Sequence, residues 1–243
     1  MNQTEVKSFH FKISYQESCI LLKKLKQINK EISFNNTNKD FQYKNTISLF
    51  FFKLKLPTLF HILHPSIKKL HHFPDLPAKT PSYLLLLIRA GASSFGIVKQ
   101  GEVKYHKTVR KYMVRKKQGK AQLIYQNLRG KARGGSKLRL ENSKKFFEEI
   151  NLKLLEWNEN IDNTDLIIVH CSSRLWNGLF TANQTPPFSM TDERIRKIPI
   201  TTYNPTFKEL KRINYNLLHG TIFVQSLKDF NNANEVVLFL NSL

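Results

Sequence analysis

The strongest hydrophobic pattern lies in the middle of the chain. Residues 83–88 form an unbroken apolar run bounded by Pro81 and Gly91, which is typical of a strand buried on both faces. Residues 95–99 follow across a Gly-Ala-Ser-Ser turn, so we expect a hairpin. The alternation and β-branched content of residues 103–109 predict a third strand. Further strand segments are expected at residues 112–114, 165–170, 198–200 and 221–224.

Two segments between these strands have the spacing or the end signals of helices. Residues 138–157 place their apolar side chains on one helical stripe. A second helix follows Asn204, which can act as its cap, and Pro205, which suits a first turn. Glu209 follows Thr206 at the spacing of a capping box. Strands mixed with such helices predict an α/β (α+β) domain in which helices pack on a mixed sheet.

Prolines mark a boundary in front of this domain. Pro74, Pro77 and Pro81 punctuate a short connector. A helix is expected near residues 20–32, within the segment that precedes the connector. The predicted parts are a divergent N-terminal extension and linker at residues 1–80, the domain at 81–226 and a C-terminal tail at 227–243.

One apolar stretch in the extension, at residues 47–63, has to be judged against a membrane span. Lys53, Lys55, Pro57 and His61 interrupt it, whereas a spanning helix needs about 20 predominantly apolar residues. The stretch therefore favours an element packed against the domain, and no membrane span is predicted.

Composition adds a strong charge signal to this pattern. Thirty-nine Lys and Arg face eighteen Asp and Glu, which gives a formal charge of +21 and a pI near 10.0. Such a balance favours a polyanionic partner, either nucleic acid or an anionic membrane surface. The two cysteines, Cys19 and Cys171, lie too far apart for a disulfide framework or a zinc spacing. This cysteine usage fits a reducing compartment, so we expect a cytoplasmic protein.

The positive charge is concentrated between residues 103 and 140, an interval with thirteen Lys or Arg and no acid. Regular patterning stops at residues 118–135, where four glycines indicate a long loop. A one-sign segment repels itself unless a partner neutralises it. Two interpretations remain open, a disordered basic tail-like loop or a loop that docks on RNA phosphates, and the second is favoured.

Several kinds of chemistry have no basis in the residues. The basic interval contains no acid for acid–base work, and the chain contains no Walker-type Gly-Lys-Ser/Thr and no convincing Ser-His-Asp set. His106, the one histidine of the basic interval, is expected to be a packed or surface residue rather than a base. The histidines at positions 61, 64, 71 and 72 lack the Cys or acid partners of a structural metal site. No metal and no other cofactor is therefore predicted.

The basic segment resembles a known family motif. Residues 106–122 read His-Lys-Thr-Val-Arg-Lys-Tyr-Met-Val-Arg-Lys-Lys-Gln-Gly-Lys-Ala-Gln. This run is similar to the central motif of the ankyrin-repeat and zinc-finger peptidyl-tRNA hydrolases, release-factor-like proteins of ribosome-associated quality control. Further resemblances follow in family order, at residues 138–142, 167–180, 194–199 and 205–212. Together they cover roughly residues 83–224, and they imply a domain related to the middle domain of eukaryotic release factors, with a long basic catalytic loop.

The resemblance assigns roles to individual residues. It implies that Gln122 is catalytic, because the family places this role on the glutamine of its Gly-x-x-Gln loop. Gly119 and Ala121 would provide loop geometry, Gly119 by its conformational freedom and Ala121 by its small size. The residues implied in binding tRNA or rRNA phosphates are Lys107, Arg110, Arg115, Lys116, Lys117, Lys120 and Arg139. Without the resemblance, Gln122 would be taken for a solvent-exposed loop glutamine.

The function implied is cleavage of peptidyl-tRNA on stalled large ribosomal subunits, by a hydrolase or a tRNA 3′-end endonuclease. Both bonds, the ester and a tRNA phosphodiester, stay open. The family's zinc finger, its ankyrin repeats and its motif for an AAA segregase are not recognisable in the sequence, which leaves recruitment of that segregase without a sequence basis. The alternatives are a non-catalytic ribosome-binding or RNA-binding module and a peripheral membrane protein that uses residues 47–63 with the basic surface.

Overall fold

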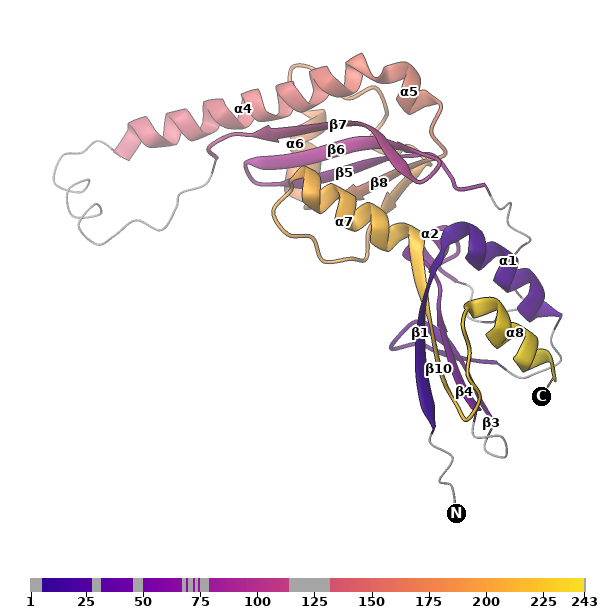
Figure 1. The fold of residues 1–243 in the computed structure, drawn as a ribbon. Coiled ribbons are helices and arrows are strands. Elements are labelled where there is room, and N and C mark those ends of the chain that lie inside the picture. The colour runs from indigo at the N-terminus through magenta and orange to yellow at the C-terminus, as the bar shows by residue number, and fades with distance from the viewer. Residues whose placement is uncertain are drawn as a thin grey trace. The chain divides into compact units, whose positions relative to one another are not determined.

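The computed structural model describes residues 6–27, 32–45, 50–66, 69, 72, 74, 79–113 and 132–242. The chain divides into two compact units. The first unit consists of residues 1–80 together with 214–243, and the second unit consists of residues 81–213 (Figure 1).

Each unit contains one sheet and the helices that cover it. The elements of the first unit are β1 (Lys7–Ser14), α1 (Tyr15–Lys26), β2 (Ser33–Asn35), β3 (Asp40–Asn45), β4 (Phe50–Lys55), α2 (Thr58–Leu63), β10 (His219–Ser226) and α8 (Ala233–Ser242). Those of the second unit are β5 (Tyr83–Arg89), β6 (Ala92–Lys99), β7 (Glu102–Arg110), α4 (Ala132–Glu156), α5 (Asn158–Asp162), β8 (Leu166–His170), α6 (Ser173–Phe180) and β9 (Ile195–Lys197). Helix α7 (Phe207–Leu218) crosses the division between the units.

The sheet of the second unit is mixed, with the strand order β7-β6-β5-β8-β9. Strand β6 is antiparallel to both of its neighbours, while β5, β8 and β9 are parallel. The predicted mixed sheet with packed helices is confirmed. The apolar run at residues 83–88 is buried at every position, as expected for a strand with protein on both faces.

Different helices cover the two faces of this sheet. Phe146 and Ile150 of α4 share one hydrophobic core with Leu84 and Leu86 of β5, and α5 and α6 contribute to the same core. Helix α7 packs on the other face (Figure 1), where a Cβ atom added to Gly96 would lie 3.1 Å from the Leu210 side chain. The same Cβ would lie only 2.4 Å from a backbone oxygen of β7, so glycine permits this close approach.

Two predicted strand segments, residues 198–200 and 112–114, are not strands at the residues that the structure describes. Residues 198–200, expected as an edge strand, are not a strand; the edge strand β9 lies directly before them, at Ile195–Lys197. The N–H of Ile198 still donates to the Val169 oxygen, at 3.0 Å, but Pro199 has no N–H with which to continue the ladder. Residues 112 and 113 do not extend β7, because its partner β6 begins at Ala92 and the last bond between the two segments runs from the Lys111 N–H to the Gly91 oxygen, at 3.0 Å. Residue 114 lies outside the described residues.

The first unit is built on an antiparallel sheet with the order β1-β10-β4-β3-β2. Strand β10 therefore belongs to the first unit, whereas the sequence placed residues 219–226 at the end of the second domain. The segment expected as a C-terminal tail contains α8, whose Val236 and Val237 are buried. Both differences arise because β10 pairs with β1 and β4, which are distant in the chain and give no local sequence signal.

The apolar stretch examined for a membrane span forms regular structure in the first unit. From Phe50 onward it supplies β4 and α2, with Phe50, Phe52 and Leu54 fully buried. Within the described part of the chain, no helix is long and apolar enough to cross a membrane.

Candidate functional site

The predicted catalytic loop joins β7 to α4, and its residues 114–131 lie outside the described residues. Gly119, Ala121 and Gln122 fall in this range, and so do the candidate phosphate-binding residues Arg115, Lys116, Lys117 and Lys120. Lys107 and Arg110 lie on β7. Arg139 lies on α4, and its side chain is outside the described part. The structure thus describes the two elements between which the loop runs.

The loop begins at the end of the sheet where the carboxyl ends of several strands lie side by side. Because β6 is antiparallel to β5 and to β7, the carboxyl ends of β5, β7, β8 and β9 share one edge. These strands end at Arg89, Arg110, His170 and Lys197. The carboxyl ends of parallel strands are a common place for ligand sites in α/β sheets. Here that edge is rich in cations and carries the start of the basic loop.

The backbone that leads into the loop is held in place on two sides. Gly91, in the β5–β6 turn, has a φ of 78°, and its carbonyl accepts the Lys111 N–H at 3.0 Å. A Cβ atom on Gly91 would lie 2.5 Å from the Lys111 oxygen. On the other side, the Asn142 amide of α4 donates to the Tyr112 oxygen at 3.0 Å. Met113 then packs against the hydrophobic core. The first residues after β7 are thereby tied to the domain.

Part of the positive charge on β7 and directly after it is neutralised by α4. The carboxylate of Glu149 lies 2.9 Å from the Lys111 Nζ and 3.9 Å from the Lys107 Nζ. Lys104 pairs with Glu102. Arg110 is exposed and has no ion pair with any described residue. Two candidate phosphate-binding residues have described side chains, and Arg110 is the one without an ion pair among the described residues. Lys107 lies in an ion pair with Glu149, an acid that the sequence analysis did not single out.

The outer surface of β7 contacts the start of α7. The ring of His106 stacks on that of Phe207, with centroids 3.7 Å apart and planes 14° from parallel. Lys211 lies over the same Phe207 ring, 4.8 Å from its centroid. His106 is thus a surface residue packed against an aromatic ring, as the sequence predicted.

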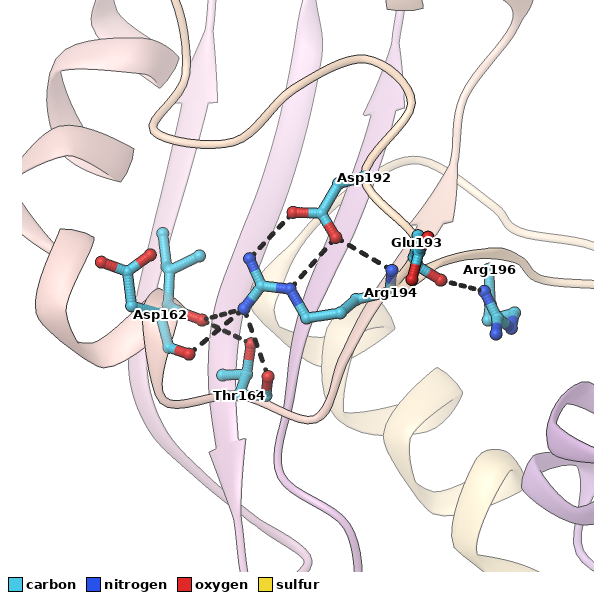
Figure 2. Close-up of polar contacts among 7 residues, drawn as sticks. Asp162, Thr164, Asp192, Glu193, Arg194 and Arg196 are labelled. Atoms are coloured by element: carbon cyan, nitrogen blue, oxygen red, sulfur yellow. Dashed lines mark hydrogen bonds and ion pairs between the residues drawn. The ribbon is translucent and has the colours of Figure 1, made fainter.

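Arg194, from the family-like segment 194–199, connects three parts of the second unit (Figure 2). Its guanidinium forms two hydrogen bonds with Asp192, at 2.9 and 3.1 Å. It also donates to the carbonyl oxygens of Ile161, Asp162 and Thr164, at 2.9, 3.3 and 3.3 Å. Arg194 therefore caps the end of α5 in front of β8, and the hydrogen bonds that its side chain donates lower the pKa of Asp192. These hydrogen bonds give Arg194 a structural role, which accounts for its presence in the family-like segment without any contact to RNA.

A second polar network fixes the start of α7. The Glu209 carboxylate accepts two hydrogen bonds from Arg212, at 2.7 and 2.8 Å, and one from the Tyr203 N–H at 2.7 Å. These bonds from Arg212 lower the pKa of Glu209 most strongly. The Thr206 hydroxyl accepts the Glu209 N–H at 3.1 Å, so Thr206 caps the helix. Glu209 completes the network toward Tyr203 rather than returning to Thr206, as a full capping box would require.

A pocket of about 330 Å³ opens at the carboxyl ends of β8 and β9. Its lining residues include Cys171, Trp176, Asn177 and Lys197. Burial raises the pKa of the Cys171 thiol to about 12, so this thiol stays protonated at neutral pH and is a poor nucleophile. Among the residues that the structure describes, no group of three His, Cys, Asp or Glu side chains is arranged to hold a metal ion.

Comparison with known proteins gives a consistent set of matches. Residues 83–224 match the family model described as Bacteroidetes VLRF1 release factor. The tRNA endonuclease ANKZF1 of Mus musculus is 32% identical over 142 residues, which cover 56% of this chain and 19% of that protein. The tRNA endonuclease VMS1 of Saccharomyces cerevisiae is 35% identical over 108 residues, which cover 44% of this chain and 17% of that protein. These matches confirm the resemblance predicted from the sequence.

Two further comparisons show how much of this chain and of its relatives the similarity covers. The human tRNA endonuclease ANKZF1 is 29% identical over 147 residues, covering 59% of this chain and 20% of that protein. The chain thus spans about a fifth of the length of the curated relatives that it matches. The solved Vms1 mitochondrial localization core covers 90% of this chain, and 85% of that chain is covered, at 18% identity. Its TM-score of 0.43 is too low to establish a common fold.

Proposed function

Because the chain belongs to the Bacteroidetes VLRF1 release factor family through residues 83–224, we propose that it cleaves peptidyl-tRNA on stalled large ribosomal subunits. The cleavage would release the nascent chain in ribosome-associated quality control. The observation that carries this proposal is the family match, which spans both the loop and the elements that hold it. Relatives with the name tRNA endonuclease support an enzyme that acts on tRNA. The cytoplasmic location expected from the cysteine usage is part of the same proposal.

Gln122 is the residue to which we assign the chemistry. A glutamine does not titrate, but its carboxamide can orient a nucleophile and its backbone N–H can stabilise developing negative charge. Most of the rate enhancement would come from placing the reacting groups correctly in a site built largely by RNA. Gly119 and Ala121 would let the loop approach that RNA closely.

The fixed start of the loop supports this assignment. Catalysis by positioning requires that the loop be attached to a rigid element. The hydrogen bonds from Lys111 to Gly91 and from Asn142 to Tyr112 provide such an attachment. Arg110 lies beside it without an acid partner among the described residues. We propose that Arg110 and the basic residues of the loop bind tRNA and rRNA phosphates, and that Lys107 joins them by exchanging Glu149 for phosphate.

The two bonds that remain open predict different products. If the 2′-hydroxyl of the ribose attacks the neighbouring phosphorus, the 5′-oxygen leaves, and the products carry a 2′,3′-cyclic phosphate and a 5′-hydroxyl. If water attacks the peptidyl ester, the tRNA keeps an intact 3′ end. The first reaction needs orientation and charge neutralisation rather than a strong base, which agrees with a loop that contains no acid or histidine.

Purified large subunits that carry peptidyl-tRNA provide the test. Replacing Gln122 by alanine should reduce peptide release by about 100-fold or more, the size of effect seen when a transition-state donor is lost. The matched control is Gln126→Ala, which removes a second glutamine of the same loop and should leave release unchanged. Mapping the tRNA 3′ end in the same samples identifies the bond.

Subunit binding, measured by co-sedimentation, separates the proposal from its alternative. Gln122→Ala should still bind large subunits, since it removes no charge. If Gln122→Ala releases peptide as fast as the unchanged chain, the catalytic assignment is wrong. A chain that binds subunits and never releases peptide would be a non-catalytic binding module.

A further inference from the structure

The first unit contains a sheet face to which the proposed function gives no role. Directly paired residues of an antiparallel sheet point to the same side. His10 pairs with Phe223, and Phe223 pairs with Lys53, so these three side chains form one row across β1, β10 and β4. The adjacent rows on this side are Gln225, Phe51 and Lys44, and Lys12, Thr221 and Lys55. We call this side of the sheet the outer face.

Helix α8 and the segment that precedes it contact the opposite side of the sheet. Phe50 and Phe9, which point away from the outer face, contact Phe230, at centroid distances of 6.2 and 5.9 Å. Phe50 also contacts Phe239 of α8, at 5.1 Å. On the outer face, by contrast, the aromatic rings contact one another: His10 and Phe223 lie 4.6 Å apart, and Phe51 and Phe223 lie 6.1 Å apart. The two phenylalanines are half-buried and His10 is exposed.

Lysines surround these rings. Lys53 lies over the Phe51 ring, 5.3 Å from its centroid, and Lys12, Lys44 and Lys55 are exposed on the same face. Among the described strand positions of this face, Asp40 is the single acid, and it is buried and accepts a hydrogen bond from Gln42 at 2.6 Å. The outer face therefore combines flat aromatic surface with net positive charge.

We propose that the outer face binds a single-stranded nucleic acid, with bases stacked on Phe51 and Phe223 and phosphates bound by the surrounding lysines. Every base has a π face, so aromatic side chains on a sheet bind unpaired bases without reading their sequence. Lysines at the margin neutralise the phosphates that connect those bases. In a duplex the bases are already stacked on each other, which leaves only the phosphates to bind.

The geometry favours nucleic acid over an anionic membrane. Insertion into a membrane interface requires apolar side chains that protrude between lipids. Phe51 and Phe223 are instead half-buried among their neighbours on the sheet. A flat, half-buried ring offers a surface for stacking and little for insertion.

Binding of a labelled oligouridylate of about twelve nucleotides to the full chain tests the proposal by fluorescence anisotropy. Phe223→Leu and Phe51→Leu keep an apolar side chain but remove the ring, and each should weaken binding by about tenfold at roughly physiological salt. Phe223→Tyr keeps the ring and should bind as the unchanged chain does. Lys53→Gln should weaken binding more than Lys23→Gln, which removes the same charge from an exposed position on α1.

The basic loop of the second unit also attracts RNA, so the site of binding has to be located. Ultraviolet crosslinking of the same oligouridylate, followed by mass spectrometry, should give adducts at peptides that contain His10, Phe51 or Phe223. These adducts should persist in Gln122→Ala, because the outer face is independent of the proposed catalytic residue. A failed release assay would therefore leave this inference standing.

Three results would overturn the proposal. Adducts confined to residues 103–140 would place all binding on the basic loop. Equal affinity of Phe223→Leu and the unchanged chain would exclude stacking. Flotation with phosphatidylserine vesicles that is lost in Phe51→Leu and Phe223→Leu, without any change in oligouridylate binding, would assign the face to a membrane surface instead.

Discussion

The two sheets of this protein differ in how many of their faces are buried. In β5 of the second unit, Leu84, Leu85, Leu86 and Leu87 are all fully buried, because helices pack on both sides. In β4 of the first unit, burial alternates: Phe50, Phe52 and Leu54 are fully buried, whereas Phe51, Lys53 and Lys55 are not. Although both units are built on a β-sheet, the two sheets therefore offer a ligand different surfaces.

This difference suggests that the two sheets contribute to function in different ways, one through its loops and the other through its face. A sheet covered on both faces offers a partner only its edges and its loops, and the proposed catalytic loop of the second unit leaves from such an edge. A sheet face on which no described helix of its unit packs offers a surface, and in the first unit that surface carries aromatic rings and lysines. Four further predictions test the comparison, from the largest expected effect to the smallest.

Adjacent residues within one strand give the largest contrast. In β4, Phe52→Ala should destabilise the first unit by about 3–5 kcal/mol, because it leaves a cavity in the core. Phe51→Ala should cost less than about 2 kcal/mol, since its ring is only partly buried. In β5, Leu86→Ala and Leu87→Ala should each cost about 2–5 kcal/mol, because both side chains are in a core.

The two units need separate readouts of stability. Both tryptophans, Trp157 and Trp176, lie in the second unit, so urea denaturation followed by tryptophan fluorescence reports on β5 variants. Amide hydrogen exchange resolved by peptide reports on β4 variants. Equal costs for Phe51→Ala and Phe52→Ala would mean that the outer face is covered, and the comparison would fail.

The turn before β6 gives the second prediction. Gly91→Ala should cost about 1–3 kcal/mol, because the alanine would have to keep a positive φ. Its Cβ would also displace the Lys111 backbone, 2.5 Å away, so peptide release should fall as well. Gly101→Ala is the control: Gly101 has a φ of 81° in the β6–β7 turn, at the opposite edge of the sheet from the loop. That variant should lose stability and keep its release activity.

Arg194 tests how the edge of the second sheet is held. Arg194→Ala removes the hydrogen bonds to three carbonyl oxygens and leaves Asp192 without the guanidinium that pairs with it. The free energy of unfolding should decrease by about 1–3 kcal/mol. Among the described residues, Arg196→Ala, two residues away, removes hydrogen bonds to the Glu193 and Ile195 oxygens, and a cost below about 0.5 kcal/mol is expected because the Arg196 side chain is exposed. Urea denaturation measures both variants, and equal costs would argue against the capping role (Figure 2).

The smallest predicted effect is a pH dependence from Glu209. The folded-state pKa of Glu209 is below its ordinary value of 4.5, chiefly because Arg212 donates hydrogen bonds to the carboxylate. The folded state thus binds this proton more weakly than the unfolded state does. The stabilisation is complete above the ordinary pKa and is lost as the pH falls through the folded-state pKa.

Urea midpoints measured between neutral pH and about pH 3 should therefore decrease on the acid side. Glu209→Gln should be less stable at neutral pH and should lose less stability on acidification, because glutamine does not titrate. Parallel pH profiles for the two proteins would show that the contribution of Glu209 to folding does not depend on its charge.

The elements of the second unit could largely be predicted from local pattern. The apolar run of β5, the alternation of β7 and the stripe of α4 appear at nearly the predicted residues. These patterns could be predicted because the spacing of apolar residues within one segment depends on which of its side chains face the core. The start of α7 was predicted in part. Thr206 does cap it, but the partners of Glu209 come from Arg212 and from the preceding turn, which the spacing of a capping box does not include.

The candidate site could be predicted less completely. The concentration of Lys and Arg in the loop is a property of the sequence, and so is the resemblance that selected Gln122. The contacts that hold the start of the loop are not, because Gly91, Asn142 and Glu149 come from other elements and meet Lys111 or its neighbours only when α4 packs on the sheet. Local periodicity contains no information about such partners.

By itself, the sequence determined β5, β6, β7, β8 and most of α4 in the central domain, the net positive charge and the family. Each of these depends on residue types at short spacing or on an ordered set of motifs. Only the tertiary structure decided that β10 belongs with β1 and β4, that one sheet is buried on both faces and the other on one, and that His10, Phe51 and Phe223 meet. The physical reason is that strand pairing joins residues distant in the chain, and the free energy that selects a pairing comes from the whole core rather than from either strand.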